Sequence, residues 1–194
     1  MTLIVEAAAA VRSATGFRSC GDAALVLRAG DCTLLAVVDA LGHGPEAAAS
    51  AARVEEVMRT HLGRPLAEVF TACDRALARL RSVVISAVRL GPGGAVFAGV
   101  GNVEIVGPKE AAHPAAVAGT VGRGIRRYRE TTLPAEAGHR WMLASDGLRP
   151  RSLRKAMEDT RQQSPAAAAD RVLALAGRDD DDASVLVMDF SEVG

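Results

Sequence analysis

The sequence predicts an α+β protein with two antiparallel β-sheets at its centre and pairs of helices outside. Its apolar pattern runs in the order strands, two helices, strands, two helices, strand, which is typical of layered α+β folds. The length of 194 residues predicts a single domain, residues 1–194, large enough to bury a core. Because 49% of the residues are hydrophobic but only 3% are aromatic, this core must consist mainly of Ala, Val and Leu.

The first strands are expected to bring two aspartates together. Leu3–Val11 is predicted as an edge strand, and residues 13–22 form a loop of small and polar residues. A hairpin of Ala23–Arg28 and Cys32–Val38 follows, because Gly30-Asp31 between two apolar runs is turn chemistry. Antiparallel pairing then places Asp22 and Asp39 side by side at the open end of this hairpin.

The rest of the chain alternates between helical and strand patterns. A proline at the first helical position and apolar stripes predict paired helices, and short runs with a period of two, separated by glycines, predict a β-meander. The expected helices are Pro45–Leu62, Pro65–Leu80, Pro150–Thr160 and Pro165–Ala176; the meander is Val83–Leu90, Ala95–Val100 and Val103–Gly107; the further strands are Ile125–Thr132, Arg140–Ala144 and Ala183–Phe190, with residues 108–124 as a loop.

Composition excludes several classes of function. Lys plus Arg and Asp plus Glu balance at 23 each, so the chain has no global field for nucleic acid or for an anionic membrane. No apolar run approaches a membrane span and no signal peptide is recognised, which predicts a cytoplasmic protein. Three widely spaced cysteines, Cys20, Cys32 and Cys73, indicate neither a disulfide framework nor a zinc site.

Aspartates recur where predicted strands end beside glycine or small residues. Asp22, Asp39, Asp146 and one member of the 179–182 run share this setting. A single such aspartate is most often a turn residue or a helix cap, but four in the same setting favour a shared role. Gathered carboxylates repel one another unless a cation bridges them, and hard oxygen ligands suit Mg²⁺ or Mn²⁺. The pattern therefore predicts a metal site, with room for two ions that activate a water and orient a phosphoryl group.

Four short motifs resemble, in order, the metal-binding motifs of the PP2C-type (PPM) serine/threonine phosphatases. They are Gly21-Asp22-Ala23, Val37-Val38-Asp39-Ala40-Leu41-Gly42-His43-Gly44, Ala144-Ser145-Asp146-Gly147-Leu148 and Asp181-Asp182-Ala183-Ser184-Val185. The chain is most similar to the bacterial branch that includes the RsbX phosphatase of the stressosome and the SpoIIE-type domains. The loops Gly99-Val100-Gly101-Asn102 and Gly119-Thr120-Val121-Gly122 also look like RsbX. The resemblance covers nearly the whole chain and implies the four-layer αββα sandwich of this family.

The resemblance also implies a metal site with two Mn²⁺ or Mg²⁺ ions. Asp22 and Asp39 would ligate metal, Asp39 bridging both ions, and Ala40 would offer its backbone carbonyl. The family usually has glycine at that position, so Ala40 requires a negative φ. Asp146 and Asp181 would complete the site, with Asp182 as the alternative to Asp181. A metal-bound water would attack phosphorus directly, which gives Asp22 and Asp39 a catalytic role as well.

Two other residues near the motifs have open roles. His43 could act as a general acid for the leaving serine or threonine oxygen, or have a structural or substrate-facing role, since it lies four residues after Asp39 and eukaryotic relatives have theirs at offset two. Arg18 could bind phosphate through a bidentate fork, or be a solvated loop residue.

The resemblance predicts a monomeric phosphoprotein phosphatase. Its expected substrates are phosphorylated STAS-domain scaffold or antagonist proteins (RsbR/RsbS-like), with no nucleic-acid or membrane partner. One alternative is a catalytically silent binding module that keeps the fold, for which Ala40 is the only hint. The other is a metal-dependent hydrolase of small phosphate esters, which activity on free metabolites but not on phosphoproteins would favour.

Overall fold

The computed structural model describes residues 2–125 and 127–193. Its strands are β1 (Thr2–Arg12), β2 (Asp22–Ala29), β3 (Cys32–Ala40), β4 (Val83–Gly91), β5 (Gly94–Val100), β6 (Glu104–Val106), β7 (Thr131–Thr132), β8 (Arg140–Ala144) and β9 (Ala183–Val193). Its helices are α1 (Pro45–Thr60), α2 (Leu66–Ala76), α3 (Pro150–Asp159) and α4 (Pro165–Ala176). Element order follows the sequence prediction, and no helix in the described residues is both long and apolar enough to cross a membrane.

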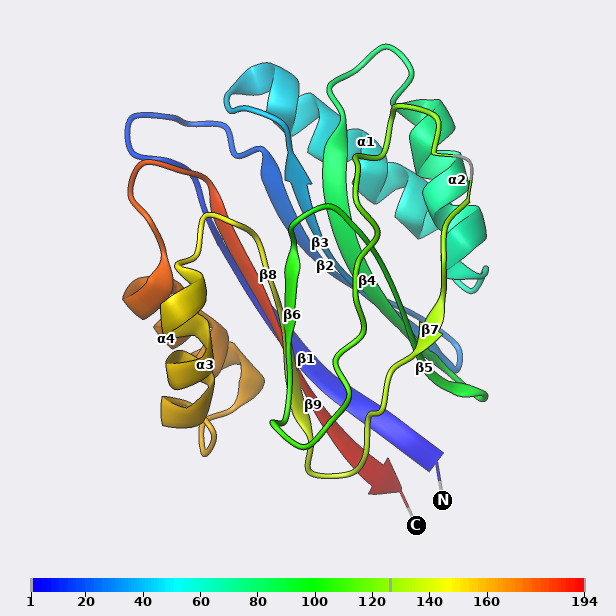
Figure 1. Ribbon diagram of the computed structural model, residues 1–194, viewed down its shortest axis with the longest axis vertical. Helices are drawn as coiled ribbons and strands as arrows, with labels where there is room; N and C mark the ends of the chain where they lie inside the picture. Colours follow the sequence, from blue (N-terminus) through cyan, green and yellow to red (C-terminus); the bar gives the residue numbers. More distant parts are fainter. Residues whose placement is uncertain (1, 126, 194) are drawn as a thin grey trace.

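The strands form two antiparallel sheets that pack face to face (Figure 1). One sheet has the order β1-β9-β8-β6 and the other β2-β3-β4-β5-β7. Helices α1 and α2 cover the second sheet, and α3 and α4 cover the first. The predicted four-layer αββα sandwich is therefore confirmed.

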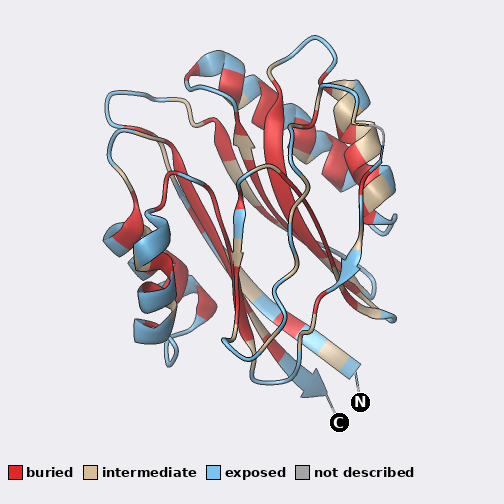
Figure 2. Ribbon diagram, viewed as in Figure 1, coloured by how far each residue is buried: buried red, intermediate tan, exposed pale blue. Residues whose placement is uncertain are grey.

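Three apolar clusters hold the layers together, and central strands such as β3 and β8 are buried on both faces (Figure 2). Alternate residues of β3 divide between them: Leu34, Ala36 and Val38 face α1 and α2, whereas Leu35 and Val37 face the other sheet. This explains why β3 is a continuous apolar run rather than an alternating one. Trp141 is fully buried between the sheets, as expected for a core residue.

Two of the predicted strands differ in the structure. The third strand of the expected meander, β6, pairs with β8 in the other sheet rather than with β5. The chain leaves β5 at Gly101, which has a φ of 90°, and the Ser86 hydroxyl then donates to the Val103 carbonyl at 2.9 Å. Instead of the strand Ile125–Thr132, only Thr131–Thr132 pairs, with β5. Residue 126 lies outside the described residues. Ile125 and Tyr128 pack against the cluster that contains α2, and Glu130 accepts a hydrogen bond from the Ala67 amide at the start of α2.

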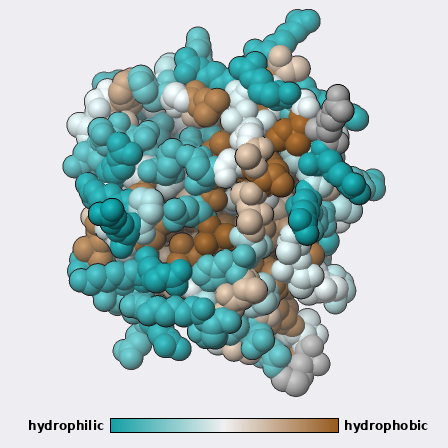
Figure 3. Space-filling model, viewed as in Figure 1, coloured by the Kyte–Doolittle hydropathy of each residue, from teal (hydrophilic) through white to brown (hydrophobic). Residues whose placement is uncertain are grey.

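The first and last strands lie together in the sheet. β1 pairs with β9 along its whole length, from Thr2 opposite Val193 to Arg12 opposite Ala183. β1 is an edge strand, as predicted. Hydrophobic surface is visible in the middle of the face shown in Figure 3, bordered by hydrophilic side chains.

Candidate metal centre

Asp22 and Asp39 face each other at the open end of the β2–β3 hairpin. They are direct partners in the antiparallel register, and opposite residues of such a pair have Cβ atoms about 5 Å apart. Asp146 directly follows Ser145 after β8, and Asp181 shortly precedes β9, whose start pairs with the end of β8. The carboxyl groups of Asp146 and Asp181 both act on Asp39. The fold thus brings the four predicted aspartates to one edge of the sandwich.

The electrostatics of this edge disfavour ionised carboxylates without a cation. Burial is the main cause that raises the pKa of Asp39 to about 8, and the charges of Asp22 and Asp146 add to it. Burial likewise raises the pKa of Asp22 to about 6, although hydrogen bonds from Ser145 and Ser184 oppose the shift. Burial and the charge of Asp146 raise the pKa of Asp181. A bound divalent cation would reverse this balance, since opposite charge favours the ionised form.

Polar side chains hold two of the carboxylates in place. The buried Ser184 hydroxyl donates to Asp22 Oδ2 at 2.7 Å, and its backbone amide donates to the Ser145 hydroxyl at 2.9 Å. The side-chain amide of Asn102 donates to Asp146 Oδ2 at 2.8 Å. These contacts fix the orientation of the carboxylates before any ligand binds.

Asp181 and Asp182 have different environments. The buried Asp182 carboxylate accepts the backbone amides of Ala14 at 2.8 Å and Gly21 at 2.6 Å, so it anchors both ends of the loop before β2. Asp181 is partly exposed and lies close enough to Asp146 to feel its charge. Because both oxygens of Asp182 already accept hydrogen bonds from the backbone, Asp181 is the better candidate ligand.

The turn after Asp39 requires glycines. Gly42 and Gly44 have φ values of 83° and 85°, in the left-handed region that favours glycine. Every described non-glycine residue has a negative φ, so Ala40 meets the condition set for its carbonyl role. Arg81 braces the turn: it donates to the Leu41 carbonyl at 3.2 Å and pairs with Glu46 in the first turn of α1 at 2.6 Å.

His43 and Arg18 both lie on exposed loops beside the carboxylates. The His43 ring stacks at a tilt on Phe17, with a centroid distance of 4.4 Å. Phe17 is 43% exposed and Arg18 next to it is also exposed. Leu41, at 45% exposure, adds apolar surface at the same edge. The Phe17 contact is compatible with either a structural or a substrate-facing role for His43, and Arg18 keeps both of its predicted alternatives.

The donor set fits hard divalent cations. Carboxylate and carbonyl oxygens are the ligands that Mg²⁺ and Mn²⁺ prefer, and Asp22, Asp39, Asp146 and Asp181 supply carboxylates of this kind. Within residues 2–125 and 127–193, no three His, Cys, Asp or Glu side chains form a ready-made cage around one ion. Mg²⁺ commonly keeps several waters and uses one or two carboxylates. Shared carboxylates with water in the remaining positions are therefore the arrangement these residues support.

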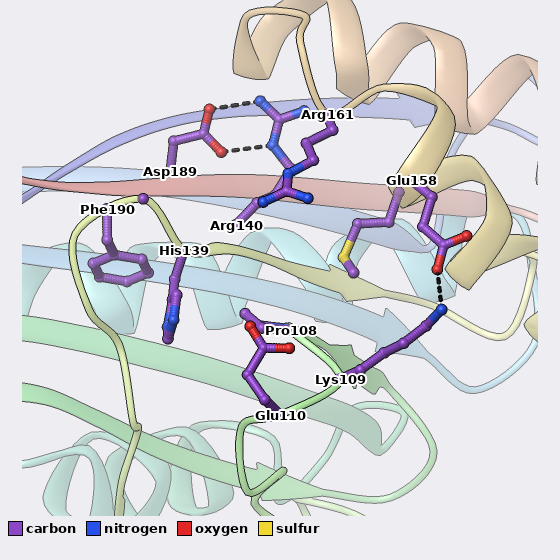
Figure 4. A pocket seen from close by; sticks show the side chains of 11 residues that line it. Pro108, Lys109, Glu110, His139, Arg140, Glu158, Arg161, Asp189 and Phe190 are labelled. Atoms are coloured by element: carbon purple, nitrogen blue, oxygen red, sulfur yellow. Dashed lines mark hydrogen bonds and ion pairs between the residues drawn. The ribbon is translucent and has the colours of Figure 1, made fainter.

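A separate cavity of about 550 Å³ lies at the opposite end of β8, between α3 and the loop after β6 (Figure 4). Its charged groups are largely paired with one another. Arg140 binds both oxygens of Asp189 and also donates to the carbonyls of Thr160 and Gln163. Lys109 reaches from the loop to Glu158 of α3 at 2.6 Å. These contacts tie α3 to the sheet, and the cavity is remote from the aspartates.

The model of the protein family described as Stage II sporulation protein E (SpoIIE) matches residues 29–191. The chain belongs to the SpoIIE family. The fold agrees, because a solved SpoIIE chain described as containing the PP2C phosphatase domain has a TM-score of 0.76 and 16% identity, covering 100% of this chain and 65% of that chain. The predicted membership of the PP2C-type phosphatases is confirmed.

Individual relatives of this SpoIIE-family chain include phosphatases. It is 25% identical over 135 residues to the phosphoserine phosphatase RsbX of Bacillus subtilis (strain 168), which covers 66% of this chain and 67% of RsbX. A chain from the structure "The bacterial stressosome: a modular system that has been adapted to control secondary messenger signaling" has a TM-score of 0.87 and 27% identity, covering 95% of this chain and 99% of that chain. The catalytic domain of PstP, solved with two manganese ions, shares the fold with a TM-score of 0.79, 20% identity and coverage of 98% and 100%.

Sequence reasoning on this SpoIIE-family chain missed the residues that support the aspartates. Ser184 and Asn102 lie within the quoted motifs, but the motifs alone give no sign that their side chains bind Asp22 and Asp146. Nothing in the sequence indicates that Arg81 supports the turn after Asp39, because Arg81 lies between a helix and a strand, far in sequence from Leu41 and Glu46.

Proposed function

We propose that residues 1–194 act as one metal-dependent protein serine/threonine phosphatase domain. The observation that carries the proposal is the convergence of Asp22, Asp39, Asp146 and Asp181 at one edge, where burial and mutual repulsion raise the pKa of Asp39 to about 8. Such a cluster is costly in a folded protein unless cations use it. Membership of the SpoIIE family and the similarity to RsbX support the same activity.

The proposed chemistry divides between ions and protein. Two Mg²⁺ or Mn²⁺ ions, when bound, supply a water of lowered pKa and charge that stabilises the phosphoryl group. Asp39 and Asp22 would hold the ions, and Ala40 would offer its carbonyl. Ser184 and Asn102 keep Asp22 and Asp146 turned toward the site. Direct attack of the water on phosphorus would break the bond to the serine or threonine oxygen, which takes up a proton as it leaves, so no side chain of the enzyme would become phosphorylated.

We further propose that the substrates are phosphoserine or phosphothreonine residues on STAS-domain proteins of the RsbR/RsbS kind. The similarity to RsbX and to a chain from a stressosome structure supports this substrate class. Asp146 is exposed and Asp181 partly exposed at the same edge as the exposed Phe17, Leu41 and His43, so a folded protein can reach the cluster from this side. The monomeric state and the cytoplasmic location stay predictions from the sequence.

The test is metal-dependent phosphate release from a phosphoserine-bearing STAS-domain protein. We expect turnover with Mn²⁺, its loss with a chelator, and its loss in Asp39→Asn. Asp31→Asn is the matched control, because Asp31 is exposed in the turn at the other end of the same hairpin. Binding of the STAS-domain protein without turnover would favour the catalytically silent binding module. Hydrolysis of small phosphate esters but not of the phosphoprotein would favour the small-ester hydrolase.

A further inference from the structure

Residues 122–125 and 127–130, which we name the arginine strap, run along α2 outside the sheets (Figure 1). The strap is fastened at both ends. The backbone amides of Gly122 and Gly124 donate to Asp74 Oδ1 near the end of α2, at 2.6 and 3.1 Å. At the start of α2, the Ala67 amide donates to Glu130 Oε1 at 2.9 Å. These contacts hold the strap in one position along the helix.

The strap turns its apolar side chains inward. Tyr128 is buried and packs edge-on against Phe70 of α2, with a centroid distance of 5.6 Å. Ile125 packs against the same cluster between the helices and the sheet. Arg127, which lies between Ile125 and Tyr128, is left exposed.

The outer face of the strap is positively charged. Arg123, Arg127 and Arg129 are exposed, as are Arg75 on α2 and Arg79 just after it. None of the ion pairs found among the described residues involves these five arginines. Residues 61–82 and 119–130 together contain eight arginines but only three acidic residues, whereas the whole chain is neutral. The charge of the chain is therefore strongly uneven.

The strap begins next to the candidate metal centre. Val121, the residue before it, exchanges backbone hydrogen bonds with Val83 at 2.8 and 3.0 Å. Val83 is in turn the register partner of Ala40, which follows Asp39. Two inter-strand spacings amount to about 10 Å. A protein whose phosphoserine reaches the aspartates must therefore pass close to the strap.

We propose that the arginine strap, with Arg75 and Arg79, docks an acidic surface of the phosphoprotein whose phosphoserine enters the metal centre. This inference rests on the proposed function and names a feature of its substrates. The candidate metal centre lies at the beginning of the basic face, so one phosphoprotein can contact the metal centre and the arginine strap at the same time. Single-stranded nucleic acid fits less well, because the one aromatic residue of the strap, Tyr128, is turned inward and offers no stacking surface.

The test uses two phosphoserine peptides of equal length. One carries Asp and Glu on both sides, beginning about three residues from the phosphoserine, because an extended chain spans 10 Å in about that number. The other has Gly and Ser at these positions. We expect a lower KM for the acidic peptide. In Arg123→Glu/Arg127→Glu this KM should rise roughly fivefold to tenfold, as expected for a few exposed charge pairs. The KM of the neutral peptide and the turnover of p-nitrophenyl phosphate should be unchanged.

The matched control is Arg154→Glu/Arg171→Glu, which makes the same charge change on exposed positions of α3 and α4. It should leave the acidic peptide's KM unchanged, and 0.5 M NaCl, where the Debye length is only about 4 Å, should abolish the wild-type preference. Equal effects of both double variants would overturn the proposal, as would a strap variant that also loses p-nitrophenyl phosphate turnover or thermal stability.

Binding is measured separately from turnover, so that a failure of the proposed phosphatase activity can be distinguished from a failure of the proposed docking surface. Fluorescence anisotropy of the labelled acidic peptide, in an Asp39→Asn background, should show binding that Arg123→Glu/Arg127→Glu weakens by a similar factor. Weak binding of this peptide beside tight, strap-dependent binding of a single-stranded oligonucleotide would replace the proposal with a nucleic-acid site. Arg123→Gln/Arg127→Gln, which removes charge without reversing it, should give a smaller loss in the same direction.

Discussion

Replacing Asp39 with Asn should stabilise the metal-free protein while it abolishes metal-dependent turnover. The folded protein raises the pKa of Asp39 from 3.8 to about 8. A group whose pKa is higher in the folded state contributes stability at low pH, and this contribution is lost as pH rises through the folded value. The metal-free protein should therefore lose stability as the pH rises toward 8, and a neutral Asn side chain should remove that loss.

The size of the effect follows from the shift. Each pKa unit corresponds to about 1.4 kcal/mol, so ionising Asp39 between about pH 5.5 and pH 8 costs roughly 3 kcal/mol. For a chain of this size, 1 kcal/mol changes Tm by about 2 to 4 °C. We expect Tm of the chelator-treated wild type to fall by roughly 6 to 12 °C more than that of Asp39→Asn over this range.

The assay is thermal unfolding in a chelator at several pH values, for wild type, Asp39→Asn and the exposed-turn control Asp31→Asn. Adding Mn²⁺ at pH 8 should raise Tm of the wild type and of the control but not of Asp39→Asn. Parallel pH curves for all three proteins would refute the reasoning, because they would mean that neither burial nor the neighbouring charges raise the pKa of Asp39 in the folded protein.

Three further predictions concern neighbouring residues. Asp182→Ala should lower the free energy of unfolding by about 2 to 4 kcal/mol by leaving two buried backbone amides unpaired, whereas Asp181→Ala should leave it within about 1 kcal/mol and weaken Mn²⁺ binding by calorimetry; the reverse order would exchange their roles. Gly147→Ala should yield little soluble protein, because a Cβ there would come within 1.9 Å of the Asp182 carbonyl oxygen; normal yield and Tm would contradict this. If His43 is a general acid, His43→Gln should reduce turnover of phosphoserine about 100-fold but hardly affect p-nitrophenyl phosphate, whose leaving group needs no proton; equal effects on both would exclude that role.

Local pattern was sufficient to predict most of the fold. The β2–β3 hairpin follows from the turn at Gly30-Asp31, and its register puts Asp22 opposite Asp39 as expected. Helix α1 begins at the predicted Pro45. Patterns of this kind act within a few residues of each other, which is why a single sequence reveals them.

The errors arose where distant contacts decide the conformation. The segment before Thr131 contains strand-forming residues, but Asp74 and the N-terminus of α2 hold it as a strap instead. β6 was expected beside β5 because the connection is short, yet the turn at Gly101 carries it to the other sheet. Only the resemblance of the motif favours Asp181 over Asp182 in the sequence, and the contacts of Asp182 with the loop before β2 add a physical reason that a run of aspartates does not reveal.

The contacts of Asp182 also constrain the order in which the molecule can assemble on the ribosome. Its carboxylate binds Ala14 and Gly21, which precede it by 168 and 161 residues, and β1 has its register partner in β9. In a growing chain, Asp22 and Asp39 are therefore synthesised long before Asp182 and Ser184, which hold the loop before β2 and Asp22 in place. Contacts between residues this distant in sequence also slow folding. Enzymatic competence should appear only after β9 has left the ribosome, and removal of the chain after Gly177 should abolish phosphatase activity.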